Sequence, residues 1–242
     1  MYKAVYLPEA IDKILKRVGI EMKNRVIWGI SLFLILVTVL FPLPAQLMDL
    51  LIVATIGISV MVLLLALFIK TTSRSWLPSI LTLFTIFKVM LSVSVIRLIL
   101  ISGYAGEVIG TFGNFLGAGN LIIGLIILGV VTAFSFAIII KSEKRVHEIT
   151  ASHTTDTNNS HDNADTFYKA MDGVIKFAKG NAILTAMALV IIVIGGVIVR
   201  DDAISVFMLL AIGYGVVFLL PTLLVVFTSG LITSRVHENT PV

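Results

Sequence analysis

Long runs of apolar residues constrain the fold of this chain more than any other feature of its sequence. A helix needs roughly 20 apolar residues to cross about 30 Å of hydrocarbon. Such runs occupy residues 26–41, 47–69, 76–101, 121–140, 182–199 and 203–232. They are too long and too unpatterned for barrel strands, and helices satisfy their backbone polar groups internally in lipid. The sequence therefore predicts an all-α, polytopic transmembrane helical protein with about six crossings.

Composition and charge narrow the class of protein. Hydrophobic residues make up 58% of the chain and charged residues 13%, whereas soluble domains carry about 25% charged residues. Cysteine is absent, which excludes a disulfide framework, a thiol nucleophile and a thiolate metal site. The net charge is +4, but the basic residues lie at the ends of the apolar runs. Lipid headgroups and topology explain them, so we expect the bilayer as partner and no nucleic acid.

The distribution of Lys and Arg predicts the orientation of the chain. Basic residues precede the first apolar run and follow the second and fourth, whereas only Arg200 is clear on the other side. Because basic loops stay in the cytoplasm, both termini and the long loop should be cytoplasmic. We expect these segments: 1–25, an amphipathic interfacial N-terminus; 26–140, crossings one to four; 141–180, a cytoplasmic loop and interfacial helix; 181–235, crossings five and six; and 236–242, a cytoplasmic tail. A frayed basic tail is the alternative for 1–25.

Two connecting segments differ from the apolar runs. The segment 102–119 is glycine-rich and predicts a connection on the periplasmic side, with a short re-entrant helix as one form. The segment 150–165 is rich in Ser, Thr, Asn and Asp, and predicts a flexible loop. His147, His153 and His161 lie in or beside it, but they form no i, i+4 pair on a firm helix. A metal site is therefore not predicted, and no cofactor is expected.

Two cations interrupt the third apolar run. Lys88 lies about halfway along it, where a lone cation costs at least about 2.5 kcal/mol, so it should face other helices, a cavity or water. A functional role and a structural contact are equally compatible with that position. Arg97 follows nine positions later and should project from the opposite side. Being near the helix end, it is expected to extend to the interface.

Two aspartates lie near predicted helix ends. Asp172 belongs to an amphipathic segment and is correctly ordered with Lys176 for a helical ion pair worth about 0.2–0.5 kcal/mol. Periodicity alone favours this ion pair over a chemical role. Asp49 follows a proline hairpin, and we expect it to cap the helix that begins there.

The last apolar run contains the residues of a kinked helix. Gly213, Tyr214 and Gly215 precede Pro221, a pattern found around gates and also in ordinary packing. These four residues are the structural gate candidates. No nucleotide loop, hydrolytic triad or dinucleotide fingerprint is present in the sequence, so an enzyme is not predicted.

Polar motifs in a fixed order carry a resemblance to a known family. The most specific stretch runs from Phe167 through Ala170-Met171-Asp172-Gly173 to Ile183. Others, collinear over 26–235, are Pro42-Leu43-Pro44, Ile56-Gly57-Ile58-Ser59, Phe87 through Arg97, Ala105-Gly106-Glu107, Lys144-Arg145-Val146-His147-Glu148 and Leu210 through Arg235. The chain resembles the membrane part of the FHIPEP family, the flagellar and type III secretion export-gate proteins.

The resemblance implies a role and a location. It implies a homo-oligomeric ring in the bacterial inner membrane, nine subunits in the family. This ring would work with other export-apparatus membrane proteins to pass unfolded protein substrates, using the proton gradient. Asp172 matches the family's aspartate in Ala-Met-Asp-Gly and becomes a candidate proton-coupling residue, with Lys88 and Arg97 as further transport candidates.

The chain departs from the family pattern at several polar positions. Asn181 and Tyr214 stand where the family has aspartates, Lys88 where it usually has arginine, and Ser92 where it has asparagine. An amide does not titrate and a tyrosine does so near 10, so neither Asn181 nor Tyr214 can exchange protons near neutral pH. The family's further helices and large cytoplasmic domain have no counterpart after Arg235. We therefore expect substrate capture to need a separate cytoplasmic partner, or the chain to be a reduced paralogue.

Three hypotheses for function follow. The first is a subunit of a type III export gate, flagellar or injectisome, with proton coupling through Asp172. The second is a structural scaffold ring of the export apparatus without proton coupling. The third is a small secondary transporter for ions or metals, which predicts inverted repeats or paired midmembrane carboxylates that the sequence does not contain.

Overall fold

The chain divides into two units, Met1–Phe41 and Pro42–Val242. The computed structural model describes residues 43–68, 76–117, 119–156, 162–199 and 204–239, together with Gly29. The predicted interfacial N-terminus and, apart from Gly29, the predicted first crossing lie outside the described residues. The helices of the second unit are α2 (Ala45–Phe68), α3 (Trp76–Ser102), α4 (Glu107–Gly117), α5 (Leu121–Asp156), α6 (Asp162–Val199) and α7 (Ile204–Asn239).

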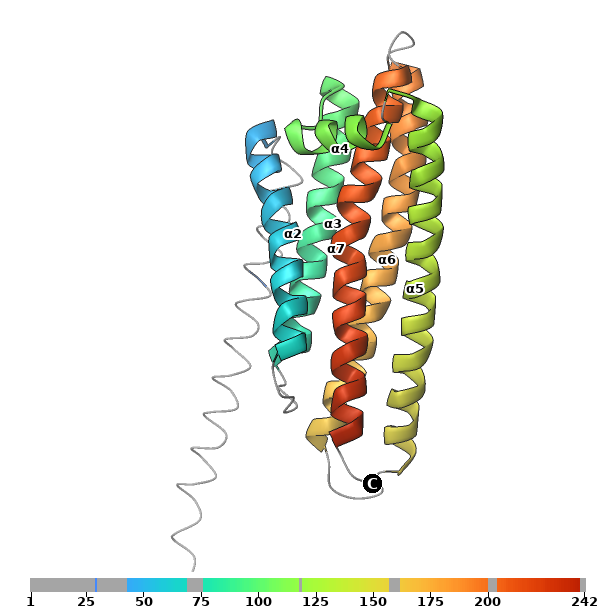
Figure 1. Cartoon of the computed structure of the whole chain (residues 1–242). Coiled ribbons are helices and arrows are strands. Elements are labelled where there is room, and N and C mark those ends of the chain that lie inside the picture. The colour runs from blue at the N-terminus through green and yellow to red at the C-terminus, as the bar shows by residue number, and fades with distance from the viewer. Residues whose placement is uncertain are drawn as a thin grey trace, which may run out of the picture. The chain divides into compact units, whose positions relative to one another are not determined.

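Five of these helices, α2, α3, α5, α6 and α7, are long and apolar enough to cross a membrane. Regular structure in the described ranges is helical throughout, so the predicted all-α transmembrane fold is confirmed. α7 contacts each of the other helices from α2 to α6 and lies among them (Figure 1). In its most apolar window 78% of the residues are buried, against 22% in α2 and in α5. The outer helices therefore leave much apolar surface for lipid or other proteins.

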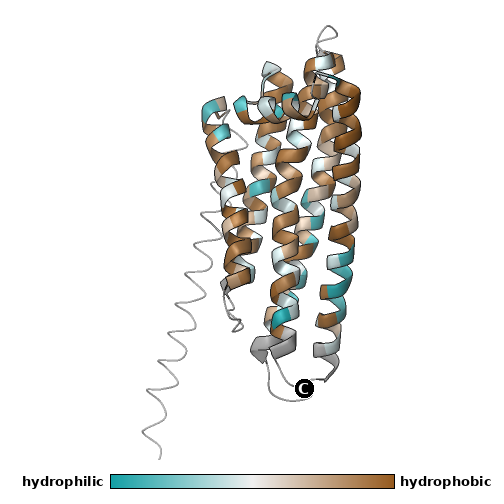
Figure 2. Cartoon of the chain, viewed as in Figure 1, coloured by the Kyte–Doolittle hydropathy of each residue, from teal (hydrophilic) through white to brown (hydrophobic). Residues whose placement is uncertain are grey.

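The ends of the long helices fall into two groups. α2, α5 and α7 run in one direction along the unit, and α3 and α6 run in the other (Figure 1). α2, α5 and α7 therefore end at the side where α3 and α6 begin. Hydrophilic residues colour this end of α5, whereas apolar residues dominate the middle of the bundle (Figure 2). The alternation matches the predicted topology, and the cytoplasmic orientation of this end stays a prediction.

α5 and α6 continue beyond the apolar runs that predict them. α5 reaches Asp156 and α6 already begins at Asp162, so the predicted flexible loop is wrong for 150–156 and 162–165; residues 157–161 lie outside the described ones. The extensions pack against each other. Val146, Thr150 and Tyr168 are buried there, and Thr150 Oγ1 donates a hydrogen bond to the Tyr168 carbonyl at 3.4 Å. Tertiary burial thus stabilises helix where composition predicts none.

The short helix α4 lies across the end of the unit opposite that of Asp156 (Figure 1). Its first two backbone N–H groups, of Glu107 and Val108, donate to the two Asp49 carboxylate oxygens at 2.8 and 3.0 Å. Asp49 therefore caps α4. The prediction that it caps the helix after the proline hairpin, α2, is wrong. Gly106 precedes the cap with a φ of 93°, and a Cβ there would lie 2.3 Å from Asp49 Oδ1. Only glycine fits this position.

Candidate functional site

Lys88 on α3 lies in the interior of the bundle and is 1% exposed. Its Nζ donates a hydrogen bond to Thr222 Oγ1 on α7 at 2.6 Å. Asn181 Nδ2 on α6 donates to the same oxygen at 3.0 Å, and Thr222 Oγ1 donates to the Phe218 carbonyl at 2.8 Å. One threonine hydroxyl therefore joins three helices. We call Lys88, Thr222 and Asn181 the interior polar centre.

The interior polar centre contains one basic group and no acid. Among the residues that the structure describes, no carboxylate forms an ion pair with Lys88. Asn181 Oδ1 is buried and accepts no hydrogen bond from the described part of the chain. Such a centre can order three helices and offer hydrogen bonds, but its amide and hydroxyl cannot bind and release protons near neutral pH.

One helical turn after Lys88, a second polar contact joins α3 and α7. Ser92 Oγ and the Tyr214 hydroxyl form a short hydrogen bond in the buried interior. The Tyr214 ring also packs against Phe218, with centroids 4.7 Å apart. The four residues at which the resemblance implies a departure therefore lie in two spatial groups, Lys88 with Asn181 around Thr222, and Ser92 with Tyr214. The sequence names these residues but gives no sign of which ones meet.

Among the remaining candidates, Arg97 lies on α3, whereas Gly213, Gly215 and Pro221 follow one another along α7. Arg97 is exposed on the side of α3 opposite Lys88, as its spacing predicts. Gly213 lies where α7 crosses α4, because a Cβ there would meet the Ile109 carbonyl oxygen at 2.0 Å. A Cβ on Gly215 would meet Leu128 on α5 at 2.4 Å, and Pro221 is buried inside an unbroken α7. Both glycines allow close helix packing, and a gating role for these residues stays a prediction.

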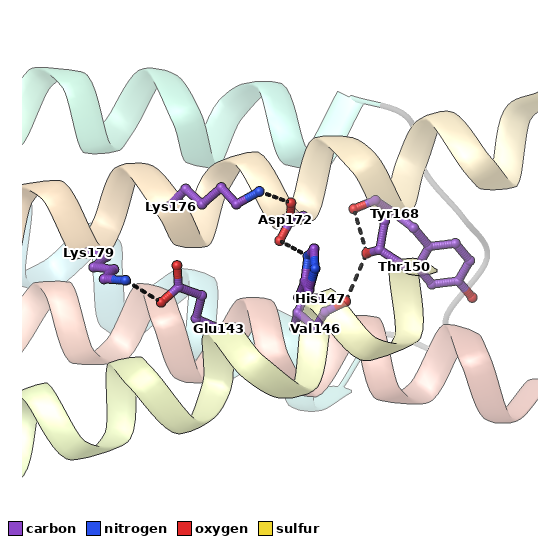
Figure 3. Close-up of polar contacts among 8 residues, drawn as sticks. All are labelled: Glu143, Val146, His147, Thr150, Tyr168, Asp172, Lys176 and Lys179. Atoms are coloured by element: carbon purple, nitrogen blue, oxygen red, sulfur yellow. Dashed lines mark hydrogen bonds and ion pairs between the residues drawn. The ribbon is translucent and has the colours of Figure 1, made fainter. Parts of the chain in front are cut away.

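Asp172 lies in a further polar region, at the end of the bundle where α5 ends and α6 begins (Figure 3). Its side chain is only 12% exposed. Oδ2 pairs with Lys176 Nζ at 2.6 Å, which confirms the predicted ion pair, and Oδ1 lies 3.8 Å from His147 Nδ1 on α5. Oδ1 is buried and accepts no hydrogen bond from the described residues. The Asp172 carboxylate is thus mostly buried, although its partner Lys176 is 55% exposed.

A second ion pair crosses between the same two helices. Lys179 Nζ on α6 lies 2.8 Å from Glu143 Oε2 on α5 (Figure 3). Asp172, His147, Lys176, Glu143 and Lys179 together form what we call the end cluster. Lys176 and His147 are 55% and 65% exposed, so Asp172 has two basic neighbours that reach water.

Sequence reasoning missed His147 and Glu143 as partners across α5 and α6. It considered His147 only with His153 and His161, whose side chains lie outside the described residues. Within the described part of the chain, no group of three or more His, Asp or Glu side chains could hold a metal ion.

At the opposite end of the bundle, the Tyr104 hydroxyl donates a hydrogen bond to Glu107 Oε1 at 3.0 Å, and this hydrogen bond raises the pKa of Tyr104.

Comparisons with known proteins give a family match over most of the sequence. The model of the FHIPEP family matches residues 35–162 and 157–242. Low calcium response locus protein D of Yersinia pestis is 31% identical over 259 residues, covering 93% of this chain. Hypersensitivity response secretion protein HrpI of Pseudomonas syringae pv. syringae is 32% identical and covers 90%. Flagellar biosynthesis protein FlhA of Proteus mirabilis is 33% identical and covers 87%.

The chain spans about a third of the length of these relatives, 36% of each. No solved structure matches the chain.

Proposed function

Because the chain belongs to the FHIPEP family, we propose that it is an inner-membrane subunit of a type III protein export gate. The observation that carries this proposal is the match to the family along most of the chain, with relatives named for secretion and for flagellar biosynthesis. The five apolar helices agree with a multi-pass location. The proposal includes a homo-oligomer in contact with other export-apparatus membrane proteins and exported substrates, with both termini in the cytoplasm.

We further propose that Asp172 couples export to proton movement. Its carboxylate is mostly covered by α5, yet its neighbours Lys176 and His147 extend into solvent. These two neighbours link the carboxylate to solvent without exposing the bundle interior. Protonation would weaken the Asp172–Lys176 pair within α6 and the contact with His147 on α5, and so change how α5 and α6 pack. That contact is the element through which proton binding would act on the bundle.

The test is export by cells in which Asp172→Asn replaces the natural chain. The amide keeps the shape and removes the titratable group, so we expect export to fall at least about tenfold, with assembly in the membrane unchanged. Glu143→Gln is the matched control, because it removes a nearby carboxylate that pairs with Lys179 instead. We expect export by Glu143→Gln to stay within about twofold of the natural chain, as for the loss of a partly exposed ion pair.

The structural scaffold is the second candidate, and the interior polar centre favours it. Lys88, Thr222 and Asn181 join three helices without a proton-exchanging carboxylate among the described residues. Unchanged export by Asp172→Asn would select the scaffold and reject proton coupling. Co-purification in mild detergent tests both candidates together, because a lone oligomer without other export-apparatus proteins would reject the export role itself.

A further inference from the structure

A cavity of about 320 Å³ lies between α5 and α7, towards the ends of both helices. Its polar lining consists of Arg145 and Ser142 on α5 and of Arg235 and Ser234 on α7. Phe227 and Leu231 form an apolar wall that continues along α7. The cavity is separate from the end cluster, and it combines two cations and two hydroxyls with an apolar side.

The lining of the cavity contains the guanidinium groups of Arg145 and Arg235 and no carboxylate. Arg145 is exposed and forms no ion pair with a described carboxylate, whereas its neighbour Lys144 lies 4.0 Å from Glu148. Arg235 is held in place by α2, because its Nη1 donates to the Ala66 and Leu67 carbonyls at 2.8 and 3.0 Å. A guanidinium group is well suited to a phosphate, since its planar N–H donors match the phosphate oxygens.

The two arginines of the cavity stand just beyond the ends of two apolar runs, the position expected for contact with lipid headgroups. Arg145 stands five residues beyond the fourth apolar run, which ends at 140, and Arg235 stands three beyond the last run, which ends at 232. Phe227 lies two helical turns before Arg235 on α7 and is 51% exposed. A group bound between the arginines would therefore have an apolar surface beside it on the side of the hydrocarbon. Basic pockets between transmembrane helices commonly bind anionic lipid headgroups.

We propose that this cavity binds the phosphate headgroup of an anionic phospholipid, with an acyl chain along Phe227 and Leu231. Its volume lies at the lower end of the range of about 300–1,000 Å³ for ligand pockets. A free phosphate would engage the arginines but leave the apolar wall uncovered. The lipid satisfies both sides, and it would tie the ends of α5 and α7 to one leaflet of the bilayer.

The test is native mass spectrometry of the full chain with phosphatidylglycerol and with phosphatidylcholine of the same acyl chains. We expect the natural chain to retain phosphatidylglycerol preferentially. Arg145→Gln should reduce that retention about tenfold, the loss of one charge-assisted contact. Lys144→Gln is the matched control, because it removes an equal charge one residue away that does not line the cavity. Its effect should stay within about twofold, as for a surface charge.

A second variant tests the cavity without changing its charge. Gly230 lines the cavity, and a Cβ added there meets no atom within 4 Å, so Gly230→Leu should fold and fill the space. We expect it to abolish the preference for phosphatidylglycerol. Equal losses in Lys144→Gln and Arg145→Gln would overturn the proposal, as would full retention in Gly230→Leu. If millimolar inorganic phosphate displaced the lipid, the cavity would be assigned to a free anion. If Arg145→Gln dissociated an oligomer, the cavity would be assigned to contact with a second subunit.

Discussion

The interior polar centre and the end cluster differ in how they accommodate a nearly buried ionisable side chain. Both hold a nearly buried ionisable side chain, Lys88 in the first and Asp172 in the second. Lys88 faces a hydroxyl on another helix, whereas Asp172 faces the bases Lys176 and His147. Neutral partners suffice in the middle of the bundle, and charged partners occur where they can reach water. Distance from solvent thus decides which polar groups can be placed together.

This difference in partners gives the two polar regions different roles in the bundle. Thr222 accepts hydrogen bonds from α3 and from α6, so the interior polar centre orders helices through a single oxygen. The described ion pairs of the end cluster all lie within or between α5 and α6, and most of its bases are exposed. A change of protonation at Asp172 would therefore alter one helix pair and leave the interior intact. Variants that remove one contact at a time show whether this division holds.

Thr222→Val should have the largest effect on stability among these variants. Valine has the shape of threonine but leaves the Lys88 ammonium without its acceptor in the interior, which should lower the free energy of unfolding by about 1–3 kcal/mol. Thr228→Val is the matched control, because Thr228 Oγ1 donates only to the Leu224 carbonyl of its own helix. Unfolding by a denaturing detergent in mixed micelles measures both.

Removing the cation gives the complementary measurement. Lys88→Met replaces a buried charge by an apolar side chain of similar length and should be close to neutral in stability. In the Lys88→Met background, Thr222→Val should cost less than it does alone, because no cation then remains unpaired. An equal cost of Thr222→Val in both backgrounds would contradict the role assigned to the hydrogen bond between Lys88 and Thr222.

Asp49→Ala tests a carboxylate at the opposite end of the bundle and should have an intermediate effect. Two backbone N–H groups of α4 lose their acceptors, so the free energy of unfolding should fall by about 1–2 kcal/mol. Hydrogen exchange at Glu107 and Val108 should accelerate. Glu107→Gln is the control, because the Glu107 side chain is exposed and bonds only to Tyr104 among the described residues. Unchanged exchange at both amides would show that Asp49 does not stabilise α4.

The sequence predicts the crossings better than it predicts the contacts between them. Apolar length defines five helices correctly, because lipid imposes that length on each helix separately. The partners of Asp49 and Lys88 lie 58 and 134 residues away, and the second partner of Asp172, His147, lies 25 residues away. Local spacing carries no information about these three contacts, although it does predict the pair of Asp172 with Lys176. Composition also fails for 150–156, where helix continues because α5 and α6 cover each other. Long-range packing, absent from local patterns, determines the site.

Loss of the Glu143–Lys179 ion pair should have the smallest effect on stability. Its coupling energy reports how strongly solvent screens charges in the end cluster. The two side chains are 20% and 39% exposed and lie 2.8 Å apart. A double-mutant cycle with Glu143→Gln and Lys179→Gln should give a coupling energy of about 0.2–1 kcal/mol, because solvent screens such pairs. The coupling should shrink further at 1 M salt, where the screening length is about 3 Å. A coupling energy above about 2 kcal/mol that salt does not change would mean that solvent is excluded from the end cluster as it is from the bundle interior. The contrast between the two polar regions would then disappear.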